Sequence, residues 1–306
     1  MSGQLGHKIE RNMLPAKLFY LLYYGAAASL IPFLVIYYEQ LGLSGRQIGV
    51  LTGVTPLVTM FSAPLWGGAA DAGNRHRAAL TLATAGALLG VLWLSAVSSF
   101  LWLLPVVVVY AFFAAPIMPL VDNTVMAVLG ERKGEYGKQR VWGAIGWGVA
   151  APLVGELTER AGLGRAFYIY IALMFVALFI GRRLPLEQAS MKQPFWNSLR
   201  RLLTQPQMAV FLVTVLVGGA GLGLVSSYLF LYLQDMGATK TMMGLSLTVA
   251  TISELPVLYF SNHLLARWGA RGLLAFALLV YVVRAFAYSV VGAVWMVLLI
   301  QLLHGC

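Results

Sequence analysis

The sequence predicts an all-α membrane protein, and its composition and its apolar runs carry that prediction. Of the 306 residues, 60% are hydrophobic and only 10% are charged, whereas soluble domains carry about 25% charged residues. The mean hydropathy of +0.80 leaves too few polar side chains for a water-compatible surface. This composition excludes a disordered chain. The single cysteine, Cys306, excludes a secreted disulfide scaffold.

Apolar runs long enough to cross a bilayer, about 20 residues in helix, follow one another along the chain. The basic N-terminal segment leads into an uncleaved first helix, because its apolar run exceeds a signal-peptide core and no cleavage site follows. Proline and glycine inside these runs are compatible with membrane helices. The predicted spans are 16–38, 48–70, 78–97, 101–128, 140–161, 164–181, 208–234, 240–262 and 271–291, with a tenth beginning near 293.

The distribution of lysine and arginine predicts the orientation. With a cytoplasmic N-terminus, most of these residues fall on the inner side, as the positive-inside rule requires. Arg284 lies inside a span, and the outer side receives only Arg46, Arg160, Arg165 and Lys240.

The chain contains an internal repeat. FLVIYYEQLGLSGRQIG, at 33–49, is similar to YLFLYLQDMGATKTMMG, at 228–244. Gly73 and Arg75 match Gly269 and Arg271 in the next loop. This arrangement resembles the parallel repeats of the major facilitator superfamily. It implies a six-helix repeat at 1–181, a cytoplasmic linker at 182–207 and an incomplete second repeat at 208–306.

The repeat also predicts a missing end. Cys306 corresponds to Ala111, midway along the fourth helix of the first copy. We therefore expect the major facilitator fold to be truncated here within the tenth helix, with on the order of 80 residues absent, and the fragment to be inactive.

The loop at 67–77, GGAADAGNRHR, resembles the major facilitator signature between helices two and three. The resemblance implies a charge lock, in which a carboxylate pairs with guanidinium or helix N-terminal groups and holds one side shut. A merely solvated turn is the alternative. The residues of this expected gating motif are Gly67, Asp71, Gly73, Arg75 and Arg77.

The segment GKQRVWGAIGW, at 137–147, resembles the fifth helix of the lactose permease and its sugar, nucleoside and aromatic-acid symporter relatives. In that group an acidic residue on helix four is the partner of the arginine in this motif. Asp122 lies at the corresponding position here, and Arg140 is the arginine. The resemblance implies that Asp122 and Arg140 bind the solute and that Trp147 stacks on its ring; an interfacial arginine and a packed tryptophan are the alternatives. Tyr24, one turn after Tyr20, is a further candidate contact, with packing as its alternative.

Three ionisable residues lie inside the later spans, where such residues usually mark a substrate or ion pathway. Glu254 and Arg284 are expected to pair with each other, because an unpaired charge in hydrocarbon is costly. His304 follows twenty residues after Arg284. The same resemblance assigns all three to proton coupling and solute binding; a structural salt bridge and a packed histidine are the alternatives. Val257 replaces an asparagine that binds sugar in the permease, which disfavours a lactose-like disaccharide.

The sequence favours a secondary transporter, proton-coupled and acting by alternating access, for a sugar, nucleoside or aromatic acid. A drug–proton antiporter is the nearest alternative, followed by a polytopic membrane enzyme and a non-transporting sensor. No metal is expected, because the histidines are scattered. No cofactor is expected either, because GGAGLG at 218–223, which superficially resembles a nucleotide-binding loop, follows no strand. The sequence also predicts no nucleic-acid partner. The expected partners are the solute, protons and a lipid bilayer, with the protein a multi-pass monomer of the cell membrane.

Overall fold

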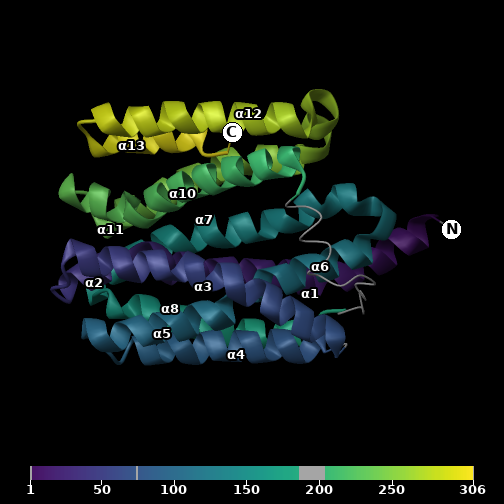
Figure 1. The fold of residues 1–306 in the computed structure, drawn as a ribbon, viewed down its shortest axis with the longest axis horizontal. Coiled ribbons are helices and arrows are strands. Elements are labelled where there is room, and N and C mark those ends of the chain that lie inside the picture. Colours follow the sequence, from purple (N-terminus) through teal and green to yellow (C-terminus); the bar gives the residue numbers. More distant parts are fainter. Residues whose placement is uncertain (1, 74, 186–203, 306) are drawn as a thin grey trace.

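The computed structural model describes residues 2–73, 75–185 and 204–305, with side chains from Met13 onward. Every regular element in these ranges is helical (Figure 1). Most of the predicted linker, including Glu187, Lys192, Arg200 and Arg201, lies outside the described residues. The elements are α1 (Ser2–Leu30), η1 (Ile31–Phe33), α2 (Leu34–Gln40), α3 (Gly45–Ala72), α4 (His76–Leu94), α5 (Phe100–Ala114), α6 (Ile117–Leu129), η2 (Gly130–Glu135), α7 (Tyr136–Ala161), α8 (Gly164–Gly181), α10 (Pro206–Asp235), α11 (Lys240–Tyr259), α12 (Ser261–Val290), α13 (Val294–Ile300) and η3 (Gln301–Leu303).

The predicted spans agree with these helices, apart from local breaks. The span expected at 101–128 is divided into α5 and α6, because Pro116 has no N–H to donate to the carbonyl four residues earlier. The loop expected between 262 and 271 is largely helical. Its break is confined to Gly269, which adopts φ 67° inside α12, a conformation that favours glycine.

Eight helical segments of the described chain have the length and hydropathy to cross a membrane. One of them, 100–161, is 62 residues long and covers two predicted spans, which the polar turn η2 separates. The helices are also apolar on their outer surfaces. Within the described chain, none of the most apolar window of α10 and 6% of that of α12 is buried.

The turns that follow the first and seventh predicted spans have the same local structure. Gly42 and Gly237 both adopt left-handed conformations, with φ of 78° and 81°. Two residues later, Ser44 and Thr239 each cap the next helix, with the side-chain oxygen accepting a backbone N–H three residues on. The repeated sequence therefore produces a repeated turn.

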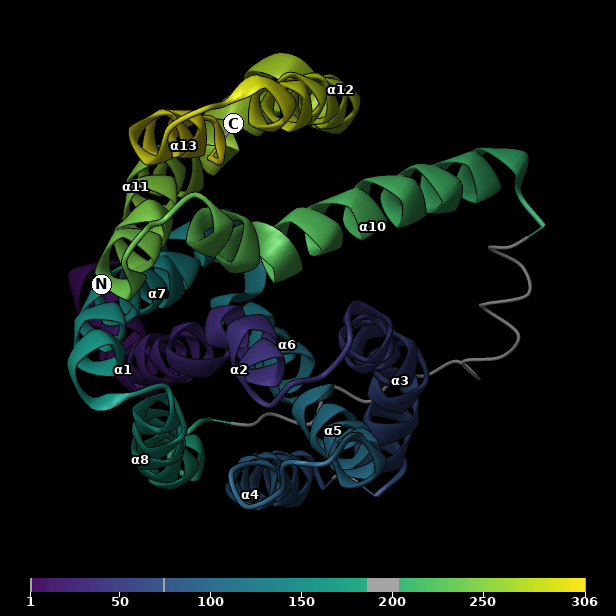
Figure 2. The same cartoon turned by 90° about the vertical axis from the view of Figure 1, so that its left-hand side faces the viewer.

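α1 packs mainly against α7 and α8 (Figure 2). The segment 204–305 meets the rest of the chain mainly through α11, which lies along α7, and through α10, which contacts η1 and α2. The buried residues of α10 all lie near its C-terminal end: Leu229, Phe230 and Leu233. From there the helix runs away from α3 (Figure 2).

Each end of the bundle is named here after one residue that lies there. The Glu39 end is where α2 finishes and α11 begins, on the left of Figure 1. The Arg77 end is the opposite one, where α3 turns into α4 and α6 turns into α7.

Candidate functional site

A cluster of tyrosines and charges joins α1, α6 and α7 inside the bundle. The fully buried Tyr20 donates a hydrogen bond of 2.6 Å from its hydroxyl to Asp122 Oδ1. One turn later on α1, the Tyr24 hydroxyl accepts a hydrogen bond from Arg140. The Arg140 guanidinium carbon also lies 4.1 Å from the centre of the Tyr24 ring and 5.7 Å from that of Tyr20, which are cation–π distances.

These contacts correct the direct pairing of Asp122 with Arg140 that the resemblance implies. The ion pairs within 4 Å in the described part of the chain do not include these two side chains. Each charge has a tyrosine as its hydrogen-bond partner instead: Tyr20 for Asp122 and Tyr24 for Arg140. Sequence reasoning singled out Tyr24 and left Tyr20 aside, although their spacing of four residues places them on one helix face.

Trp147 lies two turns beyond Arg140 on α7 and is half-buried. The glycine that precedes it brings α7 against α1: a Cβ on Gly146 would lie 2.2 Å from the Leu21 carbonyl oxygen. Within the described residues, the Trp147 indole belongs to no ring pair and no hydrogen bond. The contact with a solute ring stays a prediction.

α7 and α11 are antiparallel and in close contact along most of their length. A Cβ on Gly244 would lie 2.4 Å from the Ala151 carbonyl oxygen, and a Cβ on Gly137 would lie 2.4 Å from the Leu258 carbonyl oxygen. Only glycine permits such an approach of one backbone to another. These contacts, near the two ends of the helices, fix the register between them.

The register places Arg140 and Glu254 at about the same level of the α7–α11 pair, and both side chains are half-buried. The expected pairing of Glu254 with Arg284 is therefore wrong for this structure, because no ion pair within 4 Å joins those two described residues. The reason is that α12 directs the Arg284 guanidinium towards η3, where other acceptors hold it.

Arg284 is 5% exposed and lies in a second polar cluster. It donates to Gln301 Oε1 at 2.5 Å and to the Tyr288 hydroxyl at 3.2 Å, and its Nη1 lies 2.8 Å from His304 Nδ1. Arginine has no acceptor atom, so His304 Nδ1 accepts, and the imidazole is neutral with its proton on Nε2. The structure thus brings Arg284 and His304 together, as the resemblance implies, and adds Tyr288 and Gln301, which sequence reasoning missed.

The second cluster adjoins α11 beside Glu254. The Gly305 amide donates to Ser253 Oγ at 3.0 Å, and a Cβ on Gly305 would lie 2.5 Å from the Glu254 amide nitrogen. Asp122, Arg140 and Glu254 are half-buried and Arg284 is buried. These four charges therefore face the protein interior rather than the lipid.

The expected gating motif lies at the Arg77 end. Asp71, at the end of α3, is 3.4 Å from His76 Nε2, the first residue of α4. The carboxylate is not paired with Arg75 or Arg77 among the described ion pairs. It lies instead beside the N-terminus of α4, and the charge lock stays a prediction. Arg77 donates to the Leu184 carbonyl oxygen at 3.4 Å.

The glycines of the motif have different surroundings. Gly67 lies within α3, and a Cβ there would meet no atom within 4 Å. Gly73 follows the last residue of α3, and a Cβ there would lie 3.2 Å from the Arg75 side chain. Asn74, which lies between Gly73 and Arg75, is outside the described residues.

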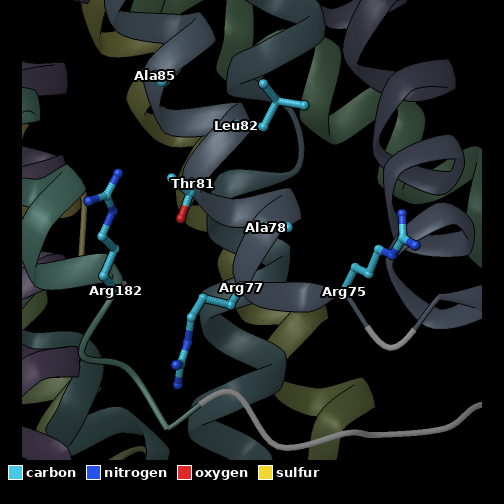
Figure 3. A pocket seen from close by; sticks show the side chains of 7 residues that line it. All are labelled: Arg75, Arg77, Ala78, Thr81, Leu82, Ala85 and Arg182. Carbon is cyan, nitrogen blue, oxygen red and sulfur yellow. The ribbon is translucent and has the colours of Figure 1, made fainter.

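An open cavity of about 840 Å³ lies beside this loop (Figure 3). Arg75 and Arg182 stand on opposite sides of the α4 backbone in the view, and Arg77 points away from both (Figure 3). The cavity residues are Arg75, Arg77, Ala78, Thr81, Leu82, Ala85 and Arg182. Within the described part of the chain, no group of three or more His, Cys, Asp or Glu side chains has the geometry to hold a metal ion.

At the turn into α7, Arg132 donates hydrogen bonds of 3.1 and 2.6 Å to the carboxylate of Glu135. These bonds lower the pKa of Glu135 below its ordinary value. The turn that precedes the Arg140 helix therefore keeps a charged pair at the Arg77 end.

Comparison with known proteins gives relatives over nearly the whole chain. The maltose permease of Geobacillus stearothermophilus is 33% identical over 300 residues, which cover 94% of this chain and 74% of the permease. The multidrug resistance protein MdtG of Dickeya zeae is 27% identical over 303 residues, covering 92% of this chain and 72% of MdtG.

The fold has solved counterparts. A crystal structure of the nucleoside transporter NupG superposes with a TM-score of 0.78 at 17% identity, covering 96% of this chain and 78% of NupG. The model of the MFS_1 like family matches residues 13–306. This chain is a secondary transporter of the membrane and belongs to the MFS_1 like family of the major facilitator superfamily.

Proposed function

We propose that the protein is a proton-coupled symporter of a small organic solute, working by alternating access. The observation that carries the proposal is the polar layer across α1, α7 and α11, in which Arg140 contacts Tyr24 on one side and faces Glu254 on the other. Ionisable side chains at this depth are costly and usually mark a substrate or ion pathway. The two repeats, 1–181 and 208–306, would rock about this layer, with 182–207 as their linker.

Among the solutes that the sequence leaves open, we favour a sugar over a nucleoside or an aromatic acid. Asp122 and Arg140 offer a carboxylate acceptor and guanidinium donors, the combination that sugar hydroxyls require, and Trp147 offers a flat apolar face. The likeness to a maltose permease supports the same class. Val257 offers no hydrogen bond, so the sugar contacts would come mainly from the α1, α6 and α7 side.

Proton coupling would act through Glu254, with Arg284 and His304 as the neighbouring cluster. A deprotonated Glu254 is attracted to Arg140 and favours the arrangement in which α7 and α11 are in contact. Protonation removes that attraction, so it changes the relative stability of the two access states. A solute bound at Arg140 would compete for the same guanidinium, which links solute binding to the proton.

The proposal also includes location, orientation and oligomeric state: the protein is a monomer in the cell membrane, with its N-terminus in the cytoplasm. In this orientation the Arg77 end faces the cytoplasm, where the gating motif and most lysines and arginines would lie. The Glu39 end would then face outward.

Drug–proton antiport is the alternative, and the likeness to a multidrug resistance protein favours it. The two functions differ in the direction of solute movement. The test is uptake by the full-length protein in membrane vesicles, with a panel of sugars, nucleosides, aromatic acids and cationic drugs. Symport predicts solute accumulation when protons flow inward, whereas antiport predicts solute expulsion under the same gradient.

The Glu254→Gln variant tests the coupling residue. We expect gradient-driven accumulation to be abolished, because the amide keeps the size of the side chain and carries no titratable proton. Glu131→Gln is the matched control, since Glu131 lies exposed in the turn η2. Normal accumulation by Glu254→Gln would remove this residue from the coupling mechanism.

A further inference from the structure

Gln301 is a buried amide within the apolar stretch 294–303. It is 1% exposed, and its Oε1 accepts hydrogen bonds from Arg284 at 2.5 Å and from the Tyr288 hydroxyl at 3.0 Å. Its Nε2 is buried and has no hydrogen-bond partner within the described residues. The side chain therefore provides one oxygen to two donors and leaves its own donor unused.

Packing alone does not explain a glutamine at position 301. A leucine would fill similar space without a buried N–H that lacks an acceptor, and such a group destabilises an apolar interior. The orientation of the amide is fixed by its neighbours, because arginine has only donors and so requires the oxygen. The contribution of Gln301 thus lies in that oxygen.

The oxygen matters because Arg284 has no carboxylate within ion-pair distance among the described residues. Its guanidinium is held only by neutral groups, from Gln301, Tyr288 and His304. A long side chain with several rotamers loses a defined orientation when its acceptors are removed. Gln301 makes the shortest of these three contacts.

We propose that Gln301 is a positioning residue: its amide oxygen clamps Arg284 and Tyr288 so that the guanidinium stays against His304. Gln301 is 1% exposed, and its contact with Arg284 is the route by which it would act. Its role in transport rests on the proposed proton-coupled function. The clamp itself is a property of the cluster that can be measured without transport.

Two measurements on the full-length protein in vesicles test the clamp. The first is the rate at which diethyl pyrocarbonate modifies His304, with His304→Ala supplying the background from the other histidines. The second is the pH profile of solute accumulation. The variants are Gln301→Leu, which removes the acceptor, and Gln301→Glu, which keeps it. Gln205→Leu is the control, since Gln205 is exposed and its side chain does not cap α10.

Gln301→Leu should release Arg284 from His304 Nδ1 and raise the modification rate roughly fivefold, the factor that corresponds to one lost hydrogen bond. It should also alter the pH profile of accumulation. Gln301→Glu should keep the modification rate within about twofold of the unmodified protein, and Gln205→Leu should change neither measurement. An unchanged rate in Gln301→Leu would overturn the proposal. If the unmodified protein does not accumulate solute on an inward proton gradient, the proposed function fails, and the modification rates still decide the role of Gln301.

Discussion

At the residue scale, three of the four interior charges of this transporter have phenols as partners. Asp122 contacts Tyr20, Arg140 contacts Tyr24, and Arg284 contacts Tyr288. A phenol forms a hydrogen bond with a charged group and leaves its charge in place. A carboxylate–guanidinium pair would form the hydrogen bonds and also cancel the charge. The charges therefore remain able to attract a solute or respond to a proton, and the phenols reduce the cost of keeping them inside the bundle.

Tyr20→Phe tests this arrangement. The change removes the donor to Asp122 and leaves a half-buried carboxylate with one hydrogen bond fewer, so the carboxylate loses its defined position. We expect solute affinity, measured as the concentration that half-saturates uptake, to weaken roughly tenfold, as the loss of a hydrogen bond to a charged group implies. Tyr23→Phe is the control, because its ring stacks on Phe19 from the same helix. Equal effects of the two changes would contradict a specific role for Tyr20.

The sequence revealed the charges of the site more readily than their partners. Asp122, Glu254 and Arg284 are conspicuous because each interrupts an apolar run, and Arg140 belongs to the motif at 137–147. Their partners depend on which helix faces lie together in space, and hydropathy does not contain that information. The register between α7 and α11, set by glycine contacts, is what places Glu254 opposite Arg140.

At the element scale, helix positions follow from length and hydropathy, which explains the agreement between predicted and observed spans. The interruptions near Pro116 and at Gly269 depend on single residues, and a window of 20 residues averages over them. The close packing of α7 against α11 likewise depends on single glycines.

Gly244→Ala tests that contact. The added methyl would meet the Ala151 carbonyl oxygen at 2.4 Å, so α11 would have to move away from α7. Such overpacking typically costs about 1–3 kcal/mol, and we expect a lower midpoint of thermal unfolding in detergent. Gly223→Ala is the matched control on α10, because a Cβ there meets no atom within 4 Å. An unchanged midpoint in Gly244→Ala would show that the two helices are not held this closely.

At the scale of the whole molecule, polar contacts close the Glu39 end between 1–181 and 204–305. Carboxylates from the first segment meet donors from the second, and two of them lie at the N-terminus of α11, where the helix dipole favours negative charge. Exposed contacts of this kind contribute roughly 0–1 kcal/mol each, so the end can open at modest cost. The contacts are Gln234 Nε2 to Glu39 Oε2 at 2.7 Å, Thr241 Oγ1 to Glu156 Oε2 at 2.8 Å and Lys240 N to Glu159 Oε2 at 2.6 Å.

The proposed alternating access requires these contacts to break in every transport cycle. We expect a covalent link between residues 39 and 234 to stop uptake by holding the Glu39 end closed. Glu39→Cys and Gln234→Cys, introduced together with Cys306→Ser, would be joined by a short, reducible thiol crosslinker, and uptake would be measured before and after reduction. Each single cysteine with the same reagent is the control and should retain uptake. Transport that continues at a normal rate after complete crosslinking would show that the two segments need not separate at this end.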